Sequence, residues 1–143
     1  MGLDMYLFAT VSAYGYLSDI STKYQVRAVE LNLITWRKVN CIHNWFVLKN
    51  VQNGVDDCNR YLVTKSNLEA LQKVVKQVLD DNSLAMELLP PSKGFFFGSQ
   101  ELDSYYFTDL QYTYDRITDI LDSYDNELLF FLLSYHPIVP AKL

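Results

Sequence analysis

Alternating apolar and polar side chains in the first quarter of the chain predict two strands. Between residues 3 and 11, Met5, Leu7 and Ala9 alternate with aromatic or polar neighbours. A period of two residues is typical of a strand with one buried face. Residues 25–34 alternate in the same way after a turn-forming cluster. We therefore expect a strand near residues 3–11 and a second strand or extended segment at residues 25–34.

The apolar spacing changes to three and four residues from about Thr35 to Lys49. This spacing predicts a helix with a buried stripe, and Thr35 is a candidate for its N-cap. On such a helix Trp36, Asn40 and His43 share one row, because side chains three and four residues apart lie on the same face. A row of this composition could line a pocket.

The remaining elements follow from turn residues and apolar spacing. We expect a short strand at residues 59–63, a helix ending near Asp80, a short helix at 83–89, a long helix at 101–122 and a strand at 127–135. Periodicity alone leaves a short helix open for the last segment. The order of elements predicts an α+β fold, with a small antiparallel sheet packed against about three main helices.

Two residues compete as the N-cap of the helix that ends near Asp80. Ser66 has Glu69 three residues later, which matches a capping box, while Thr64 starts the helix sooner. With either cap, this helix has an apolar face made by Leu68, Leu71, Val75 and Val78. The long helix has an apolar face through Leu102, Tyr106, Leu110, Ile117 and Ile120 or Leu121, opposite Asp115, Asp119 and Asp122.

Length and charge restrict the function classes. The chain has 143 residues, of which half are apolar, a size typical of one compact domain, and we expect a single domain over residues 1–143. The net charge is −5, which argues against a broad phosphate-tracking surface and hence against direct nucleic-acid binding. A small basic pocket remains compatible with this charge. A homo-oligomer that buries exposed aromatic side chains is as compatible as a monomer.

The cysteines and the termini indicate a soluble intracellular protein. Cys41 and Cys58 form no CxxC pair, which favours reduced thiols in a cytosol. Residues 1–8 lack the basic start of a secretory signal, and the apolar run at residues 128–133 is too short to span a membrane. The scattered cysteines and histidines predict no metal site, and no cofactor-binding loop is present in the sequence.

Residues 36–46 are the first candidate for a binding site. Arg37 and Lys38 could clamp a phosphate while Trp36 stacks a base, because arginine offers a planar fork of donors and base stacking tolerates many sequences. Asn40 and His43 would then orient the ligand. The alternative is a helix that faces the core and exposes its cations to solvent. A lone histidine is more often a hydrogen-bonded structural group than a general base.

Residues 92–99 are the second candidate, because three phenylalanines stand between glycines. Glycine tolerates backbone angles that other residues resist, so the segment suits a short strand or a tight loop. Lys93, Ser99 and backbone amides could contact an anion there. The segment resembles neither the Walker loop nor the dinucleotide fingerprint, and a buried aromatic strand is the alternative. Tyr106 is a further candidate for stacking a base.

Four segments of the chain together carry a resemblance to a known family. They are MGLDMYL at residues 1–7, WRKVNCIHNWF at 36–46, NGVDDC at 53–58, and LLP at 88–90 through GFFFGS at 94–99. The chain resembles a family of small, functionally uncharacterised proteins of tailed bacteriophages over residues 1 to about 121, and these motifs mark kinship without carrying an established chemistry. The resemblance implies an accessory protein made in the cytoplasm of an infected bacterium, where such proteins commonly bind host proteins or defence signals.

These observations favour a binding protein over an enzyme. The leading hypothesis is a phage counter-defence or host-takeover factor that sequesters a small anionic, nucleotide-like ligand. It assigns no catalytic residue, metal or cofactor. The expected ligand-binding residues are Trp36, Arg37, Lys38, Asn40, His43, Lys93, Ser99 and Tyr106.

Two other hypotheses remain open. The protein could inhibit a host protein through the acidic, tyrosine-rich surface of its long helix, which carries Asp115, Asp119 and Asp122. It could also be a small hydrolase that uses His43 with Asp56 or Asp57, although no nucleophile or metal set accompanies them.

Overall fold

The sheet of this protein has four antiparallel strands, in the spatial order β2-β1-β4-β3. The computed structural model describes residues 3–12, 28–47, 51–54, 57–91, 104–123 and 129–135. All four predicted strands are present, with shifted ends, and they are β1 (Asp4–Ser12), β2 (Ala28–Arg37), β3 (Arg60–Val63) and β4 (Leu129–Tyr135). The C-terminal strand β4 therefore lies between β1 and β3, and β2 and β3 are the edges.

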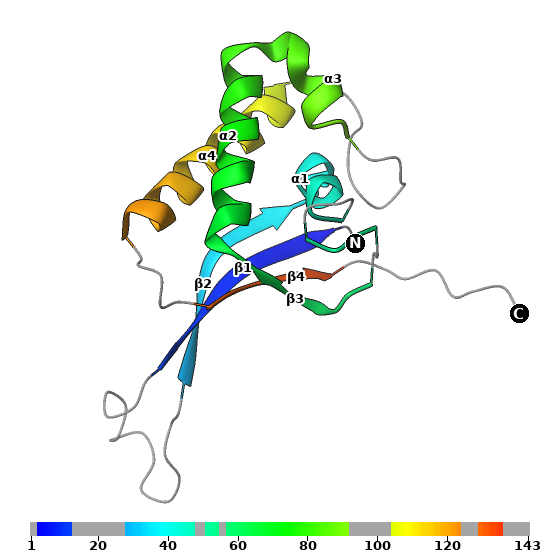
Figure 1. Cartoon of the computed structure of the whole chain (residues 1–143). Coiled ribbons are helices and arrows are strands. Elements are labelled where there is room, and N and C mark those ends of the chain that lie inside the picture. The colour runs from blue at the N-terminus through cyan, green and yellow to red at the C-terminus, as the bar shows by residue number, and fades with distance from the viewer. Residues whose placement is uncertain are drawn as a thin grey trace, which may run out of the picture.

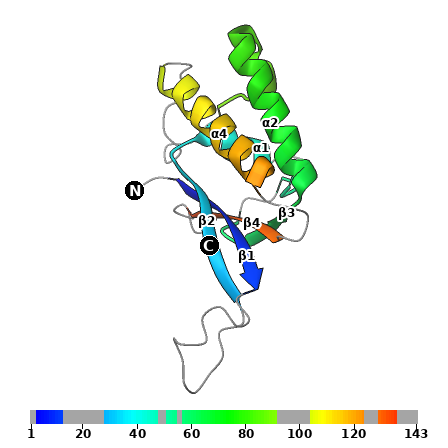
Figure 2. The ribbon, with the colours of Figure 1, turned by 90° about the vertical axis from the view of Figure 1, so that its left-hand side faces the viewer.

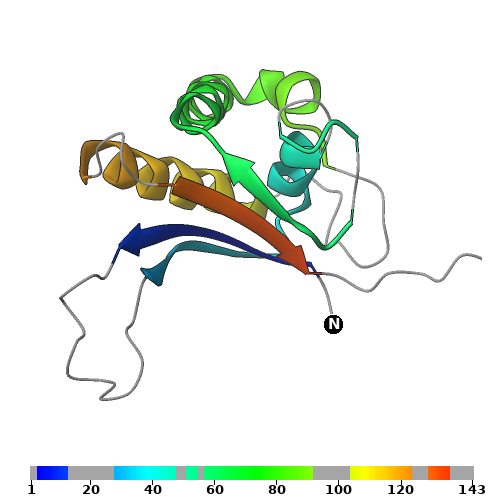
Figure 3. The ribbon, with the colours of Figure 1, turned by 60° about the horizontal axis from the view of Figure 1, so that its bottom comes forward.

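The described helices lie together on one face of this sheet, as Figures 1 and 3 show. They are α1 (Asn40–Trp45), α2 (Lys65–Asp80), α3 (Ala85–Leu88), which follows a short 3₁₀ turn, and α4 (Ser104–Ser123). The two long helices, α2 and α4, run side by side over the strands (Figure 2). This arrangement confirms the α+β prediction and leaves the opposite face of the sheet without a described helix.

The core lies between the sheet and the helices. On β1 the alternation predicted from the sequence is confirmed, because Met5, Leu7 and Ala9 are fully buried beneath the helices. Burial of a large apolar side chain typically contributes about 1.5–3 kcal/mol relative to leaving it exposed. The predicted apolar face of α2 is confirmed as well, since Leu68, Leu71, Val75 and Val78 are all fully buried.

Thr64, and not Ser66, begins α2. The Thr64 side chain accepts a hydrogen bond from the Asn67 backbone amide at 3.1 Å, and the Asn67 side chain accepts one from the Thr64 amide at 2.9 Å. This reciprocal pair is a capping box in which asparagine takes the place of glutamate. The alternative based on Ser66 and Glu69 is therefore wrong.

Helix α4 confirms the long helix expected at residues 101–122 over the part of that segment that the structure describes, which begins at Ser104. Tyr106, Leu110, Ile117 and Ile120 are buried, and Leu121 is half-buried. Leu102 lies outside the described residues. Asp115, Asp119 and Asp122 are exposed on the opposite side, as expected.

The helix predicted from Thr35 to Lys49 is wrong over its first turn. Residues up to Arg37 belong to β2, where Trp36 pairs with Met5 and Arg37 pairs with Asp4. Lys38 then adopts a left-handed backbone with φ of 59°, and its amide donates to the Leu3 carbonyl at 2.7 Å. Strand pairing therefore extends to residue 37 and a sharp turn follows. The helix begins only at Asn40, without a side-chain cap.

Candidate functional site

The row of Trp36, Asn40 and His43 expected on one helix does not exist, because Trp36 lies on β2 and the other two residues lie on α1. The Trp36 side chain is only 1% exposed. Its indole Nε1 donates to Thr113 Oγ1 at 2.8 Å, and its ring packs against Phe46 at 6.1 Å between centroids. Trp36 is thus part of the core beneath α4, and no base can stack on it in this arrangement.

Asn40, His43 and Tyr106 are also buried. His43 Nδ1 lies 3.4 Å from Ser134 Oγ on β4, which places the imidazole between α1 and the sheet. The Tyr106 hydroxyl donates to the Leu89 carbonyl at 2.8 Å, and burial raises the pKa of this tyrosine well above its ordinary value. His43 thus connects α1 to β4, and Tyr106 connects α4 to the end of α3. Their roles in ligand binding stay predictions that burial does not favour.

The other predicted site residues divide into two groups. Arg37 and Lys38 are exposed and remain available to an anion. Lys93 and Ser99, with the rest of the glycine-flanked phenylalanine segment, lie outside the described residues, as does Asp56. Asp57 accepts hydrogen bonds from Tyr61 and Asn59. The expected cluster of eight ligand-binding residues is therefore not assembled within the part of the chain that the structure describes.

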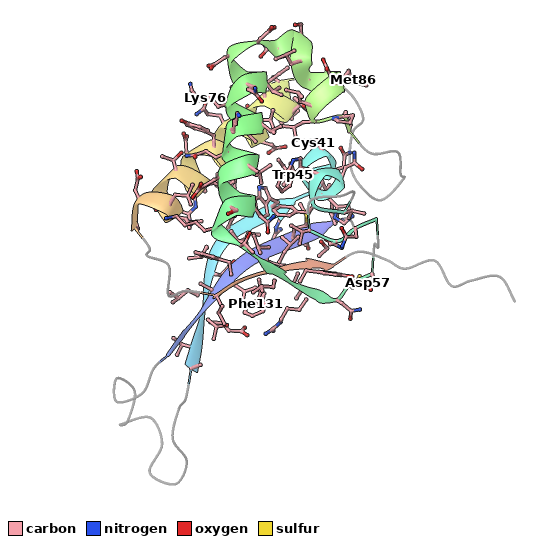
Figure 4. All side chains as sticks on the ribbon, in the orientation of Figure 1. Cys41, Trp45, Asp57, Lys76, Met86 and Phe131 are labelled. Atoms are coloured by element: carbon pink, nitrogen blue, oxygen red, sulfur yellow. The ribbon has the colours of Figure 1, made fainter. Side chains whose placement is uncertain are left out.

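A hollow of about 340 Å³ lies on the face of the sheet opposite the helices, because its lining residue Tyr6 alternates on β1 with the core residues Met5 and Leu7. Figure 4 places Phe131 on this side, whereas Cys41 and Trp45 lie in the helical layer. We call this side the open face. All four strands contribute to the hollow, which is lined by Tyr6 and Phe8 of β1, Glu30 and Asn32 of β2, Arg60 of β3 and Leu133 of β4.

Two stacked phenylalanines and a guanidinium group form the centre of the open face. The rings of Phe8 and Phe131, which are register partners on β1 and β4, lie 5.6 Å apart with an interplanar angle of 22°. The Arg60 guanidinium carbon lies 4.6 Å from the Phe8 ring centroid and 5.7 Å from that of Phe131. A cation held over an aromatic face in this way is attracted by the ring quadrupole. The Arg60 side chain also covers Phe8, which is only 7% exposed.

An ion pair connects the two edge strands across the open face. Arg60 Nη1 on β3 lies 3.1 Å from Glu30 Oε1 on β2, and both side chains are about half exposed. Strands β4 and β1 lie between the two edges. Neighbouring strands are about 4.8 Å apart, so Arg60 reaches Glu30 by extending over the two phenylalanines.

Polar side chains follow the open face along β2. On β2, Thr35 pairs with Tyr6 and Asn32 pairs with Phe8. Residues three apart on a regular strand point to opposite faces, but a register shift between Leu7 and Phe8 leaves Leu33 as an extra residue in β2. This bulge places the side chains of Asn32 and Thr35 on the same face of the sheet. Asn32 Nδ2 donates to Thr35 Oγ1 at 2.9 Å. The row starts at Glu30 and reaches Arg37, the partner of Asp4, at the end of the strand.

A second exposed surface lies on α4. Tyr105 and Tyr112 are 77% and 41% exposed, and together with Asp119 they stand seven residues apart on one side of the helix. Asp115 and Asp122 flank this row. Within α4 the one cation, Arg116, donates from Nη2 to the Leu33 carbonyl on β2. The outer side of α4 is therefore acidic and carries two phenolic rings.

Sequence reasoning missed the residues of the hollow. The strand containing Tyr6 and Phe8 was expected, but periodicity does not reveal which strands become neighbours. Glu30 and Arg60 are 30 positions apart in the sequence, and only the order of the strands brings them together. The signal that could have indicated this face is the presence of aromatic side chains on the outward positions of two apolar strands, at Tyr6, Phe8 and Phe131.

The described residues contain neither a candidate metal site nor a candidate membrane span. Among them, no three histidine, cysteine, aspartate or glutamate side chains are grouped to hold a metal ion. None of the described helices has the length and apolar character needed to cross a membrane. Comparison of the chain with protein-family models, with curated proteins and with solved structures gives no match.

Proposed function

We propose that this protein binds a small anionic, nucleotide-like ligand on the open face of its sheet and acts by sequestering it. The observation that carries the proposal is the hollow of about 340 Å³, with its aromatic floor, its guanidinium group and its amide. This volume lies within the usual range for small-molecule sites, about 300–1,000 Å³.

The arrangement of the open face suggests how such a ligand lies. One face of the Arg60 guanidinium rests on Phe8, so its other face offers a planar surface for a ring. Glu30 repels a bare anion in the hollow, and the charged end of the ligand therefore lies elsewhere. Arg37 and Lys38, both exposed at the end of β2, give that end two cations. The base lies in the hollow and the phosphate lies towards residues 37 and 38.

The resemblance to small bacteriophage proteins suggests a biological setting for this activity. In that setting the protein is an accessory factor in the cytoplasm of an infected bacterium, and it removes a signalling nucleotide as part of counter-defence or host takeover. The ligand site moves from the buried residues Trp36, Asn40, His43 and Tyr106 to the open face. Arg37 and Lys38 keep the role that the sequence suggested.

Calorimetric titration with nucleoside monophosphates tests the proposal. Binding should be detectable for the wild-type protein, and Arg37→Ala should weaken it by about tenfold, the effect of losing about 1.4 kcal/mol of a charged contact. Lys65→Ala removes a cation from the exposed start of α2 and should change the affinity little. Equal losses in the two variants, or no binding of any nucleotide, would overturn the proposal. Native mass spectrometry of protein from infected cells would show whether a nucleotide copurifies.

The acidic surface of α4 favours a second candidate function, inhibition of a host protein that has a basic surface. Its support is the arrangement of Tyr105, Tyr112 and three aspartates on one exposed side, while Arg116 points to the sheet. Charge reversal at Asp115, Asp119 and Asp122 should then weaken capture of the host partner, and added salt should slow association. Capture that is insensitive to both changes would remove this candidate.

A further inference from the structure

The β2 side of the hollow is a wall that carries hydrogen-bond acceptors from Glu30 and Asn32, beside the remaining N–H of the Asn32 amide and the N–H groups of Arg60. Glu30 uses Oε1 to bind Arg60, but an ionised carboxylate has two oxygens with about four acceptor positions. Its side chain is half exposed at the rim of the hollow. Two residues along the same strand, Asn32 gives an amide proton to Thr35, which fixes the orientation of the amide group and keeps its carbonyl oxygen as an acceptor.

The purine bases differ in the hydrogen-bonding groups that they can present to the acceptors of this wall. The Watson–Crick edge of guanine has two adjacent donors, N1–H and the 2-amino group, which one carboxylate can accept together. Adenine presents an acceptor, N1, at the corresponding position and would face the carboxylate with like partial charge. Hypoxanthine keeps N1–H and lacks the 2-amino group. An acceptor wall therefore prefers guanine, then hypoxanthine, then adenine.

We infer that the open-face hollow is selective for guanine nucleotides, with Glu30 as the residue that determines base specificity. This inference rests on the proposed nucleotide-binding function and names its ligand class. Glu30 accepts from N1–H and the 2-amino group, while Asn32 lines the same wall and Arg60 covers the ring. Ring stacking and the phosphate contacts are common to all purine nucleotides, so the selectivity comes from Glu30.

The expected preference is measurable. A well-formed bidentate contact to a base is worth about 1–3 kcal/mol of discrimination, which corresponds to about a 5- to 150-fold ratio of dissociation constants. Calorimetric titration of the full chain with GMP, IMP and AMP should give affinities in that descending order. Since this comparison uses the wild-type protein, it needs no variant to fold.

Two matched variants identify the residue. Glu30→Gln keeps the size of the side chain and an acceptor for Arg60, but it loses the carboxylate, so the ratio of GMP to AMP affinity should fall by about tenfold or more. Glu69→Gln is the control, because Glu69 is exposed on α2, on the opposite side of the sheet, and the ratio should not change. Thermal unfolding of Glu69→Gln should match that of the wild type, and Glu30→Gln should be only slightly less stable, because it weakens the half-exposed ion pair with Arg60.

The outcomes separate the inference from the function on which it rests. If GMP, IMP and AMP all fail to bind, the proposed function is overturned. If all three bind with equal affinity, or if Glu30→Gln leaves the GMP to AMP ratio unchanged, nucleotide binding stands and guanine selectivity by Glu30 is overturned. The inference is supported if the affinity of the wild type falls from GMP through IMP to AMP, if Glu30→Gln makes these affinities equal, and if Glu69→Gln leaves them different.

Discussion

Arg60 and Glu30 belong to the two opposite edge strands of the sheet, yet their side chains meet at 3.1 Å. The contact crosses β4 and β1 and lies above Phe8 and Phe131. Three strand spacings amount to about 14 Å, a distance that the long side chains of arginine and glutamate span together. The ion pair thus crosses the open face and forms part of the wall of its hollow.

The ion pair should contribute little to stability. Both side chains are about half exposed, and solvent-exposed pairs are typically worth about 0.2–1 kcal/mol. Arg60→Ala should lower the free energy of unfolding by about 1 kcal/mol, because it also loses the contact with the Phe8 ring. Urea unfolding of the single variants and of the Arg60→Ala, Glu30→Ala double variant gives the coupling energy, which should not exceed about 1 kcal/mol.

Arg60→Lys is the matched variant for the aromatic contact. Lysine keeps the charge but not the planar guanidinium group, so it should retain the coupling to Glu30 while exposing more of Phe8 to solvent. A coupling energy well above that of exposed pairs would show that the pair is shielded from water in solution, and this would contradict the exposure that the structure gives it.

The buried hydrogen bond between Trp36 and Thr113 should matter more. Thr113→Val keeps the shape of the side chain but removes the acceptor of the indole N–H, which is 2.8 Å away and buried. An unsatisfied buried donor costs about 1–3 kcal/mol, and urea unfolding should show a loss of stability of that size.

Thr108→Val is the control for this prediction, because Thr108 lies on the same helix, is exposed and bonds only locally to the Ser104 carbonyl. It should change the free energy of unfolding by about 0.5 kcal/mol or less. Equal effects of the two substitutions would mean that the Trp36 contact contributes nothing specific to stability.

Local periodicity was sufficient for most of the fold. On β1 and α2 the apolar residues recur with the period of their element, and each element buries that face against a neighbour. For such segments the local pattern and the tertiary environment agree. The α+β class and the outward position of Asp115, Asp119 and Asp122 could therefore be predicted from the sequence.

The segment from Thr35 to Lys49 shows where periodicity fails. Trp36, Val39 and Phe46 are spaced as on a helix, and all three are buried, but they reach the core from a strand, a turn and a helix in succession. The pairing of Trp36 with Met5 on β1 is a long-range contact that local spacing does not contain. Local spacing did not indicate the hollow for the same reason, because residues from all four strands line it.

The choice between Thr64 and Ser66 as the N-cap of α2 can be tested in solution. Thr64→Ala removes the acceptor of the Asn67 amide, and loss of such a cap costs about 0.5–2 kcal/mol. Ser66→Ala changes an exposed residue inside the first turn and should be near neutral. Thermal and urea unfolding of both variants gives the comparison, and a larger loss for Ser66→Ala would contradict the capping box described here.

The two cysteines should differ in reactivity. Burial, with a smaller contribution from the negative charge of Asp109, raises the pKa of the Cys41 thiol from 9.0 to about 12, whereas Cys58 is half-buried. The thiolate is the reactive form. At pH 8 a shift of this size lowers the thiolate fraction of Cys41 about a thousandfold. Iodoacetamide labelling followed by peptide mass spectrometry should therefore modify Cys58 well before Cys41 in the native protein.

The same shift gives a dependence of stability on pH. Because the folded-state pKa of Cys41 lies above the unfolded value, the neutral thiol favours the folded protein fully below about pH 9, and this contribution is lost as the pH rises towards 12.

In the Cys58→Ser variant, which leaves Cys41 as the only thiol, labelling should be slow in buffer and fast in urea. Labelling at equal rates in both conditions would show that Cys41 is accessible in the folded protein.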